Sequence, residues 1–262
     1  MTEKPYVRGW LAAACALLLA ACGNGSDSAG QADAGPTTPA ALSFRVAGNA
    51  PAGTPWHAQW ERFEASIREQ PESGLDPQMF VTGQLGNPDA ALANTRRGRV
   101  QVGGFPLAGA ATVVPELNML LVPFLFENEA EVDYVLDNHL LSAFEDLFRE
   151  KQLVLLQWVD AGWNNLYGSE SLATPTAVSG KALRSQPTIA SQVFLESLGA
   201  DTIPMGYAEV LPALQTGLIK GGESVTPMYL VGGLVGEASH LTLTRHAYDS
   251  GVIVANRTWF EG

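Results

Sequence analysis

Cysteine is nearly absent from this sequence, which contains only Cys15 and Cys22 among its 262 residues. Cys15 lies in an uncharged, largely apolar run over residues 9–21 that follows Lys4 and Arg8, and this order is typical of a secretory signal peptide. Because such a segment is removed, the mature chain would keep a single cysteine. A framework of disulfide bonds is therefore excluded.

Positive charge is also scarce, with 15 Lys and Arg against 27 Asp and Glu and a formal net charge of −12. Removal of residues 1–21 would take away two basic residues and one acidic residue, which changes the net charge to −13. Such an acidic surface argues against nucleic acid as a partner. No apolar run approaches the roughly 20 residues that a membrane-spanning helix needs, so only a lipid could anchor the chain.

The common enzyme motifs are missing as well. The sequence has no GxSxG elbow, no P-loop, no HExxH and no CxxC. The four histidines, His57, His139, His240 and His246, show no metal-ligand spacing. Ser239 precedes His240 directly, but consecutive residues on a strand face opposite ways and do not readily exchange a proton. We therefore predict that the chain is not an enzyme and needs no metal or cofactor.

Residues 19–22, Leu-Ala-Ala-Cys, resemble the bacterial lipobox, in which the cysteine is acylated and becomes the first residue of the mature chain. We predict a lipoprotein signal peptide over residues 1–21, lipid attachment at Cys22, and a flexible tether over 22–42 that is poor in large apolar side chains. The protein would then lie in the periplasm, anchored to a bacterial membrane. The alternative is an ordinary signal peptide with a chance cysteine.

From Leu42 onward the pattern alternates between strands and helices. We expect strands near 42–46, 79–81, 100–102, 153–159, 182–184, 202–204, 241–244 and 251–256. We expect helices beginning at Thr54-Pro55 and Asn87-Pro88, and others over 132–147, 188–198, 207–216 and 227–237. Pro212 is unfavourable inside a helix unless it occupies the first turn. This order predicts an α/β sheet with helices on both faces.

Four blocks resemble the substrate-binding proteins of tripartite ATP-independent periplasmic (TRAP) transporters. They are GKALRSQPTIASQVFLESLGADTIPMGYAEVLPALQTGLIKGGESVTP at 180–227 and the segments 81–103, 114–126 and 240–249, in the family's order. The resemblance implies a two-lobed (Venus-flytrap) α/β receptor that binds a small organic anion, usually a carboxylate, and delivers it to the TRAP permease subunits. A sensor or partner-binding lipoprotein with the same fold and no permease is the alternative.

The resemblance also implies how the chain is divided. Lobe I would comprise residues 43–163 and 249–262, and lobe II would comprise 164–248, with crossings near 160–166 and 246–251. Members of this family usually continue for some tens of residues after the second crossing. We therefore expect a C-terminus that is truncated relative to the family.

Arg184 matches the family arginine that binds the ligand carboxylate, and its planar donors can reach both carboxylate oxygens. An ion pair with one of the acidic residues is the alternative role. Asn164 stands where many members have a second arginine, and Ser224 replaces an asparagine. Since both changes remove strong donors, the ligand would carry fewer anionic groups than a C4-dicarboxylate, or would be turned differently. A turn-forming Asn164 and a structural Ser224 are the competing interpretations.

Three aromatic residues complete the implied site. Tyr207 falls on a family aromatic that packs against the ligand, although a core position with a bonded hydroxyl is the alternative. Trp163 lies beside Asn164, where it would line the pocket or pack between the lobes. Phe105 follows a strand in the loop that would form the wall of lobe I.

Overall fold

The computed structural model describes residues 41–262. The predicted signal peptide, the lipid site at Cys22 and nearly all of the predicted tether lie outside these residues. Within the described part of the chain, no helix combines the length and the apolar character that a membrane crossing requires.

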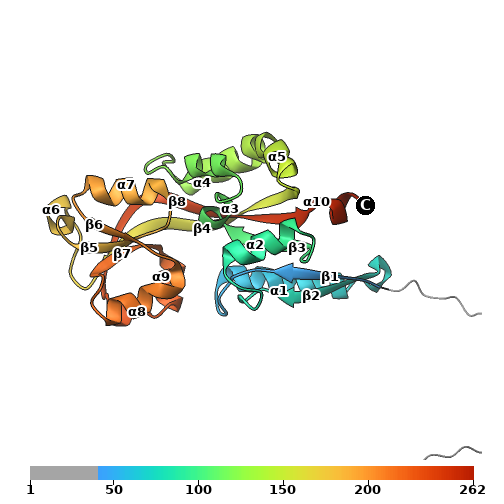
Figure 1. The fold of residues 1–262 in the computed structure, drawn as a ribbon, viewed down its shortest axis with the longest axis horizontal. Coiled ribbons are helices and arrows are strands. Elements are labelled where there is room, and N and C mark those ends of the chain that lie inside the picture. Colours follow the sequence, from blue (N-terminus) through green and yellow to red (C-terminus); the bar gives the residue numbers. More distant parts are fainter. Residues whose placement is uncertain (1–40) are drawn as a thin grey trace, which may run out of the picture. The chain divides into compact units, whose positions relative to one another are not determined.

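One mixed sheet of eight strands organises the fold, in the order β2-β1-β3-β8-β4-β7-β5-β6 (Figure 1). The strands are β1 (Leu42–Ala47), β2 (Leu75–Phe80), β3 (Val102–Pro106), β4 (Leu153–Gly168), β5 (Ala182–Ser185), β6 (Asp201–Pro204), β7 (Gly221–Val225) and β8 (His240–Asn256). β1 is parallel to β2 and β3, and β5 is parallel to β6 and β7. The two parallel groups are joined through β8 and β4.

β4 and β8 are the longest strands and pair antiparallel along nearly their whole length. Their register shifts between Asp160 and Gly162 and again between Asn164 and Leu166. Gly162 has a φ of 105°, which favours glycine because it lacks a Cβ atom. These irregularities fall within the predicted first crossing. The lobe boundaries themselves remain a prediction.

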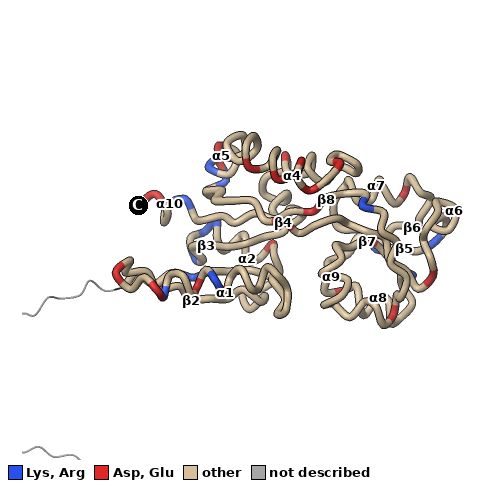
Figure 2. Tube along the Cα trace, turned by 180° about the vertical axis from the view of Figure 1, so that it is seen from behind, with Lys and Arg blue, Asp and Glu red and all other residues tan. Residues whose placement is uncertain are grey.

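Helices cover both faces of the sheet. They are α1 (Pro55–Arg68), α2 (Pro88–Arg96), α3 (Leu107–Ala110), α4 (Glu129–Val135), α5 (Leu141–Glu150), α6 (Pro175–Val178), α7 (Ile189–Ser197), α8 (Val210–Gln215), α9 (Thr226–Val231) and α10 (Arg257–Glu261). Short 3-10 turns occupy Pro71–Ser73, Pro115–Leu121, Tyr207–Glu209 and Leu234–Gly236. Acidic residues are frequent on α4 and α5 (Figure 2).

The predicted helix starts are confirmed by their caps. The side chains of Thr54 and Asn87 accept hydrogen bonds from the backbone at His57 and Ala90, and a proline opens each helix. Pro212 is the third residue of α8, in the first turn, where no intrahelical N–H bond is lost. The helix predicted over 132–147 is interrupted by a π-helical turn at Leu136–Leu140.

Alternating side chains of β8 show how the sheet is covered. Val252 and Val254 pack on one side in a core that includes Phe144 of α5, while Ile253 and Ala255 pack on the other in a core with Trp60 of α1. In the second half, two further cores similarly use alternate residues of β4. The predicted α/β architecture with helices on both faces is thus confirmed. One strand, β7, was not predicted from the sequence, and it carries part of the site.

Candidate functional site

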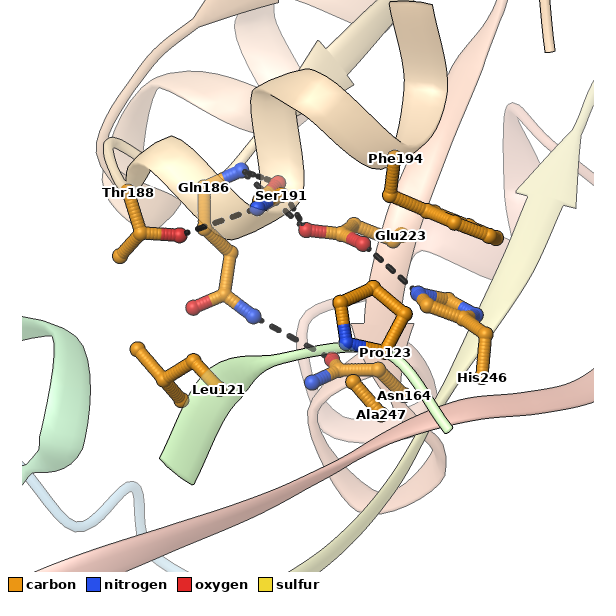
Figure 3. A pocket seen from close by; sticks show the side chains of 10 residues that line it. All are labelled: Leu121, Pro123, Asn164, Gln186, Thr188, Ser191, Phe194, Glu223, His246 and Ala247. Carbon is orange, nitrogen blue, oxygen red and sulfur yellow. Dashed lines mark hydrogen bonds and ion pairs between the residues drawn. The ribbon is translucent and has the colours of Figure 1, made fainter. Parts of the chain in front are cut away.

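A small pocket lies where the segment after the 3-10 turn Pro115–Leu121 meets α7, β7 and the central strands (Figure 3). The ten residues that line it are Leu121, Pro123, Asn164, Gln186, Thr188, Ser191, Phe194, Glu223, His246 and Ala247. Three separate stretches of the chain therefore contribute, from before β4, from β4 to β7, and from β8. The lining thus brings together polar and apolar side chains from distant parts of the chain.

A buried ion pair forms one wall of the pocket. Oε2 of Glu223 lies 2.8 Å from Nε2 of His246, and both side chains are almost fully buried. Oε1 of Glu223 accepts from the hydroxyl of Ser191, and Phe194 stacks on the His246 ring. Burial alone would raise the pKa of Glu223. The hydrogen bond and charge of His246, with smaller effects of Ser191 and Arg184, outweigh burial and lower that pKa.

Asp249 lies directly behind the pocket lining. Its Oδ2 accepts a 3.4 Å hydrogen bond from Nε2 of Gln186, and the same nitrogen donates to Oδ1 of Asn164 at 3.3 Å. Burial raises the pKa of the Asp249 carboxyl to about 6; hydrogen bonds from Gln186 and Asn164 oppose this shift, and the charge of Glu223 adds to it. A carboxyl group with a pKa of about 6 therefore lies beside the pocket.

Arg184 is buried in β5, outside the pocket lining. Its Nε donates to the Met205 carbonyl at 3.3 Å and its Nη1 donates to the Glu223 carbonyl at 2.9 Å. Among residues 41–262, no carboxylate lies within ion-pair distance of the guanidinium, and no hydrogen bond of Nη2 is found. Arg184 therefore has no ion-pair partner in the described part of the chain, and the alternative of a structural ion pair is not supported there.

Strand register separates Arg184 from the pocket. Arg184 pairs with Gly222, so its side chain shares a face of the sheet with that of Ser224 and not with that of Glu223. Asn164 pairs with Val225 and therefore shares the face of Glu223, on which it lines the pocket. The structure thus places Arg184, which was predicted to bind the ligand carboxylate, and Asn164 on opposite faces of β7.

Tyr207 and Ser224 lie on the Arg184 side. The Tyr207 hydroxyl donates to the Met228 carbonyl of α9 at 2.5 Å, and burial raises its pKa while the charge of Arg184 lowers it. The Ser224 hydroxyl donates to the Val225 carbonyl at 3.2 Å. Both hydroxyl protons are thus used by the protein's own backbone. Tyr207 and Ser224 could still accept hydrogen bonds from a ligand.

The other two predicted residues lie elsewhere. Trp163 donates from Nε1 to Glu129 of α4 at 2.7 Å, and the Arg245 guanidinium lies 4.7 Å from its ring centre. Phe105 was predicted in a loop after a strand, but it lies within β3 and is buried in the core of the first half of the sheet. Of the six residues predicted to bind ligand, the structure therefore brings only Asn164 into the pocket lining, and the roles of all six stay predictions.

Sequence reasoning missed several polar residues of this region, namely Gln186, Ser191, Glu223, His246 and Asp249. Gln186 follows Arg184 by two residues, and Glu223 directly precedes Ser224. Both therefore lie within the block 180–227 that carries the family resemblance. No group of three or more Asp, Glu, His or Cys side chains suited to a metal ion is found in residues 41–262.

Gly222 is required by the packing around Arg184. A Cβ atom there would lie 2.8 Å from the Arg184 carbonyl oxygen and 2.9 Å from both Arg184 Cβ and the Tyr167 hydroxyl. We expect Gly222→Ala to lower the free energy of unfolding by about 1–3 kcal/mol, as overpacking does, in urea denaturation. Gly236→Ala is the control, because nothing lies within 4 Å of its Cβ position. Equal stability of the two variants would contradict the packing argument.

Known proteins resemble this chain in sequence and in fold. Residues 46–262 match the family model described as bacterial extracellular solute-binding protein, family 7. A solute-binding protein of Chromohalobacter salexigens is 29% identical over 227 residues, covering 86% of this chain and 68% of the relative. The 2,3-diketo-L-gulonate-binding periplasmic protein of Escherichia coli is 27% identical, covering 79% of this chain and 63% of the relative.

Solved structures agree with these matches. A TRAP periplasmic solute-binding protein from Roseobacter denitrificans with bound β-D-glucuronate has a TM-score of 0.79 at 27% identity and covers 84% of this chain and 74% of its own. A counterpart from Sulfitobacter with bound β-D-galacturonate has a TM-score of 0.79 at 26% identity, covering 84% and 73%. These neighbours confirm the predicted binding-protein fold, and the chain belongs to family 7 of the bacterial extracellular solute-binding proteins.

Proposed function

We propose that this protein binds a small organic acid outside the cytoplasm and delivers it to the membrane subunits of a TRAP permease. Membership of an extracellular solute-binding family supports the receptor role. Two structural neighbours hold sugar acids, glucuronate and galacturonate, which supports a carboxylate as the ligand. A receptor needs no covalent chemistry, in keeping with the lack of enzyme motifs in the sequence.

The observation that carries this proposal is the buried guanidinium of Arg184. A buried charge is costly unless a counter-charge compensates it, and residues 41–262 supply no ion-pair partner for Arg184. Its two carbonyl bonds hold Nε and Nη1 in place and leave Nη2 as a donor. A solute carboxylate would provide the missing negative charge and a charge-assisted hydrogen bond.

Closure of the two halves follows from this placement. Arg184 belongs to the half formed by β5, β6 and β7, and β4 and β8 connect that half to the β1–β3 group. An anion that first meets Arg184 in an open form would gain its remaining contacts when the first half closes over it. The closed form is then populated because it binds the anion more tightly than the open form does.

A thermal-shift screen of the mature protein against organic acids tests the proposal. A ligand that binds only the folded state raises the unfolding temperature in proportion to RT ln(1 + [L]/Kd). We expect stabilisation by one or more carboxylates, with sugar acids among the first candidates. A screen of several hundred acids with no stabilising compound would contradict the proposed function.

We further propose that Cys22 is lipid-modified and anchors the receptor to a membrane in the periplasm, on the strength of the lipobox-like residues 19–22. The variant Cys22→Ser cannot be acylated at this position. We therefore expect it to appear in the soluble periplasmic fraction, whereas the unchanged protein sediments with membranes. The measurement is fractionation followed by immunoblotting, and a Cys22→Ser variant that stays with the membranes would overturn the anchor.

A further inference from the structure

Asp249 has a buried carboxyl group with one unsatisfied oxygen. Asp249 is 8% exposed, and its Oδ1 has no hydrogen-bond partner in residues 41–262. It forms no ion pair with any described basic residue. Burying a carboxylate without donors is strongly unfavourable, so a group of this kind in a binding protein points to a donor that arrives with the ligand.

The hydrogen bond from Gln186 to Asp249 is long. Nε2 of Gln186 is shared between Asp249 and Asn164 at 3.4 Å and 3.3 Å, both beyond the usual 2.7–3.2 Å of N–H···O hydrogen bonds. Gln186 lines the pocket, and Figure 3 shows its amide directed toward Asn164. Gln186 thus belongs to the pocket lining and also contacts the carboxyl of Asp249.

The groups around Asp249 determine which donor fits. Asn164 of β4 and Gln186 after β5 are neutral amides, and Glu223 of β7 is the charged group that raises the pKa of Asp249. His246, on the same strand as Asp249, already pairs with Glu223. A second carboxylate of a solute would be repelled here by Asp249 and Glu223. A hydroxyl group can donate a hydrogen bond without that repulsion.

We propose that Asp249 is a specificity residue of the receptor, which accepts a hydrogen bond from a hydroxyl of the bound acid and thereby selects hydroxylated monocarboxylates over acids without hydroxyl groups. The inference rests on the proposed function, because it assumes that the solute is an organic acid. The amide nitrogen of Gln186, 3.4 Å from Oδ2 of Asp249, lies where that hydroxyl would donate.

The test compares D-glucuronate with cyclohexanecarboxylate, an acid with a six-membered ring and no hydroxyl, by calorimetric titration at pH 7.5. We expect Asp249→Asn to weaken glucuronate binding at least about tenfold, as loss of a charge-assisted bond does. Affinity for cyclohexanecarboxylate should change less than threefold or improve, so the ratio of the two affinities falls. A general structural defect would weaken both acids together, and that result would overturn the inference.

Two comparisons sharpen the test. Asp160→Asn is the control, because Asp160 is an exposed carboxyl of β4 outside the pocket lining. The ratio of the two affinities in this variant should equal that of the unchanged protein. The affinity of the unchanged protein for glucuronate should also fall from pH 7.5 to pH 5.5, since protonation of Asp249 removes the negative charge that strengthens the hydrogen bond. Asp249→Asn should lack this dependence. The opposite pH trend would contradict the role of an ionised acceptor.

The outcomes separate this inference from the proposed function. If the unchanged protein binds no carboxylate at all, the proposed receptor function fails, and the role of Asp249 fails with it. If the unchanged protein binds glucuronate and Asp249→Asn binds it equally well, only the role of Asp249 fails.

Discussion

Replacement of Arg184 by alanine is expected to weaken binding of the carboxylate ligand at least tenfold. Truncating one partner of a buried, hydrogen-bonded charge pair costs about 2–5 kcal/mol, because the other charge stays buried and unpaired. Isothermal titration calorimetry with the best acid from the screen measures the loss.

The structure also shows what Arg184→Ala does to the fold. The carbonyls of Met205 and Glu223 each lose a donor when the guanidinium is removed. We therefore expect Arg184→Ala to lower the unfolding temperature moderately. Arg184→Lys is a second variant, which keeps the positive charge. Lysine should bind the acid more tightly than alanine and less tightly than arginine. Unchanged affinity in a folded Arg184→Ala protein would contradict the assignment.

Among the proposed variants, removal of the His246 side chain is expected to produce the largest decrease in the free energy of unfolding. The variant His246→Leu leaves Glu223 buried without a counter-charge, and breaking a buried ion pair in this way costs about 3–5 kcal/mol. For a domain of this size, each kcal/mol corresponds to about 2–4 °C in unfolding temperature. Differential scanning calorimetry should therefore show a decrease of roughly 6–20 °C.

The exposed pair between Arg245 and Glu129 provides the control for that measurement. Its side chains are 51% and 58% exposed, and such surface pairs contribute about 0–1 kcal/mol. Glu129→Gln should thus shift the unfolding temperature far less than His246→Leu. Similar shifts in the two variants would contradict the importance of the buried pair.

The pH dependence of stability follows from the same pair. The folded protein lowers the pKa of Glu223 below its ordinary value of 4.5, so the stabilisation is present above that value and is lost as the pH falls through the lower pKa of the folded state. Asp249 has the opposite sign. Its pKa of about 6 in the folded state lies above its ordinary value of 3.8, so its contribution to stability is present below the ordinary value and is lost as the pH rises to about 6. Asp249→Asn should therefore remove this loss of stability between about pH 4 and 6, which thermal unfolding at a series of pH values measures.

Local patterns predicted most of the elements. The helix starts at Pro55 and Pro88 carry both a cap and a first-turn proline, and these short-range signals do not depend on the rest of the fold. The apolar run at 153–159 predicted a strand covered on both faces, which β4 is. β7 was missed because Gly-Gly-Glu-Ser-Val has no apolar alternation. Its Gly222 is needed for contact with Arg184, and this contact is visible only in the folded structure.

The site was harder to predict than the fold. Arg184 and Asn164 were expected together, but strand register places them on opposite faces of β7. Glu223 and His246 are 23 residues apart, and Gln186 and Asp249 are 63 residues apart. No spacing rule relates such pairs, because they meet only when β8 returns beside β4. A resemblance to a family identifies aligned positions, but it does not supply these local contacts.

The central claim is that the protein recognises the carboxylate of its solute. The most direct measurement is calorimetric titration of the unchanged protein with D-glucuronate and with D-glucose, which differ only in having a carboxylate or a hydroxymethyl group at C6. The account predicts that glucuronate binds at least about 30-fold more tightly, which corresponds to about 2 kcal/mol. Equal affinity for the two sugars, or tighter binding of glucose, would contradict it.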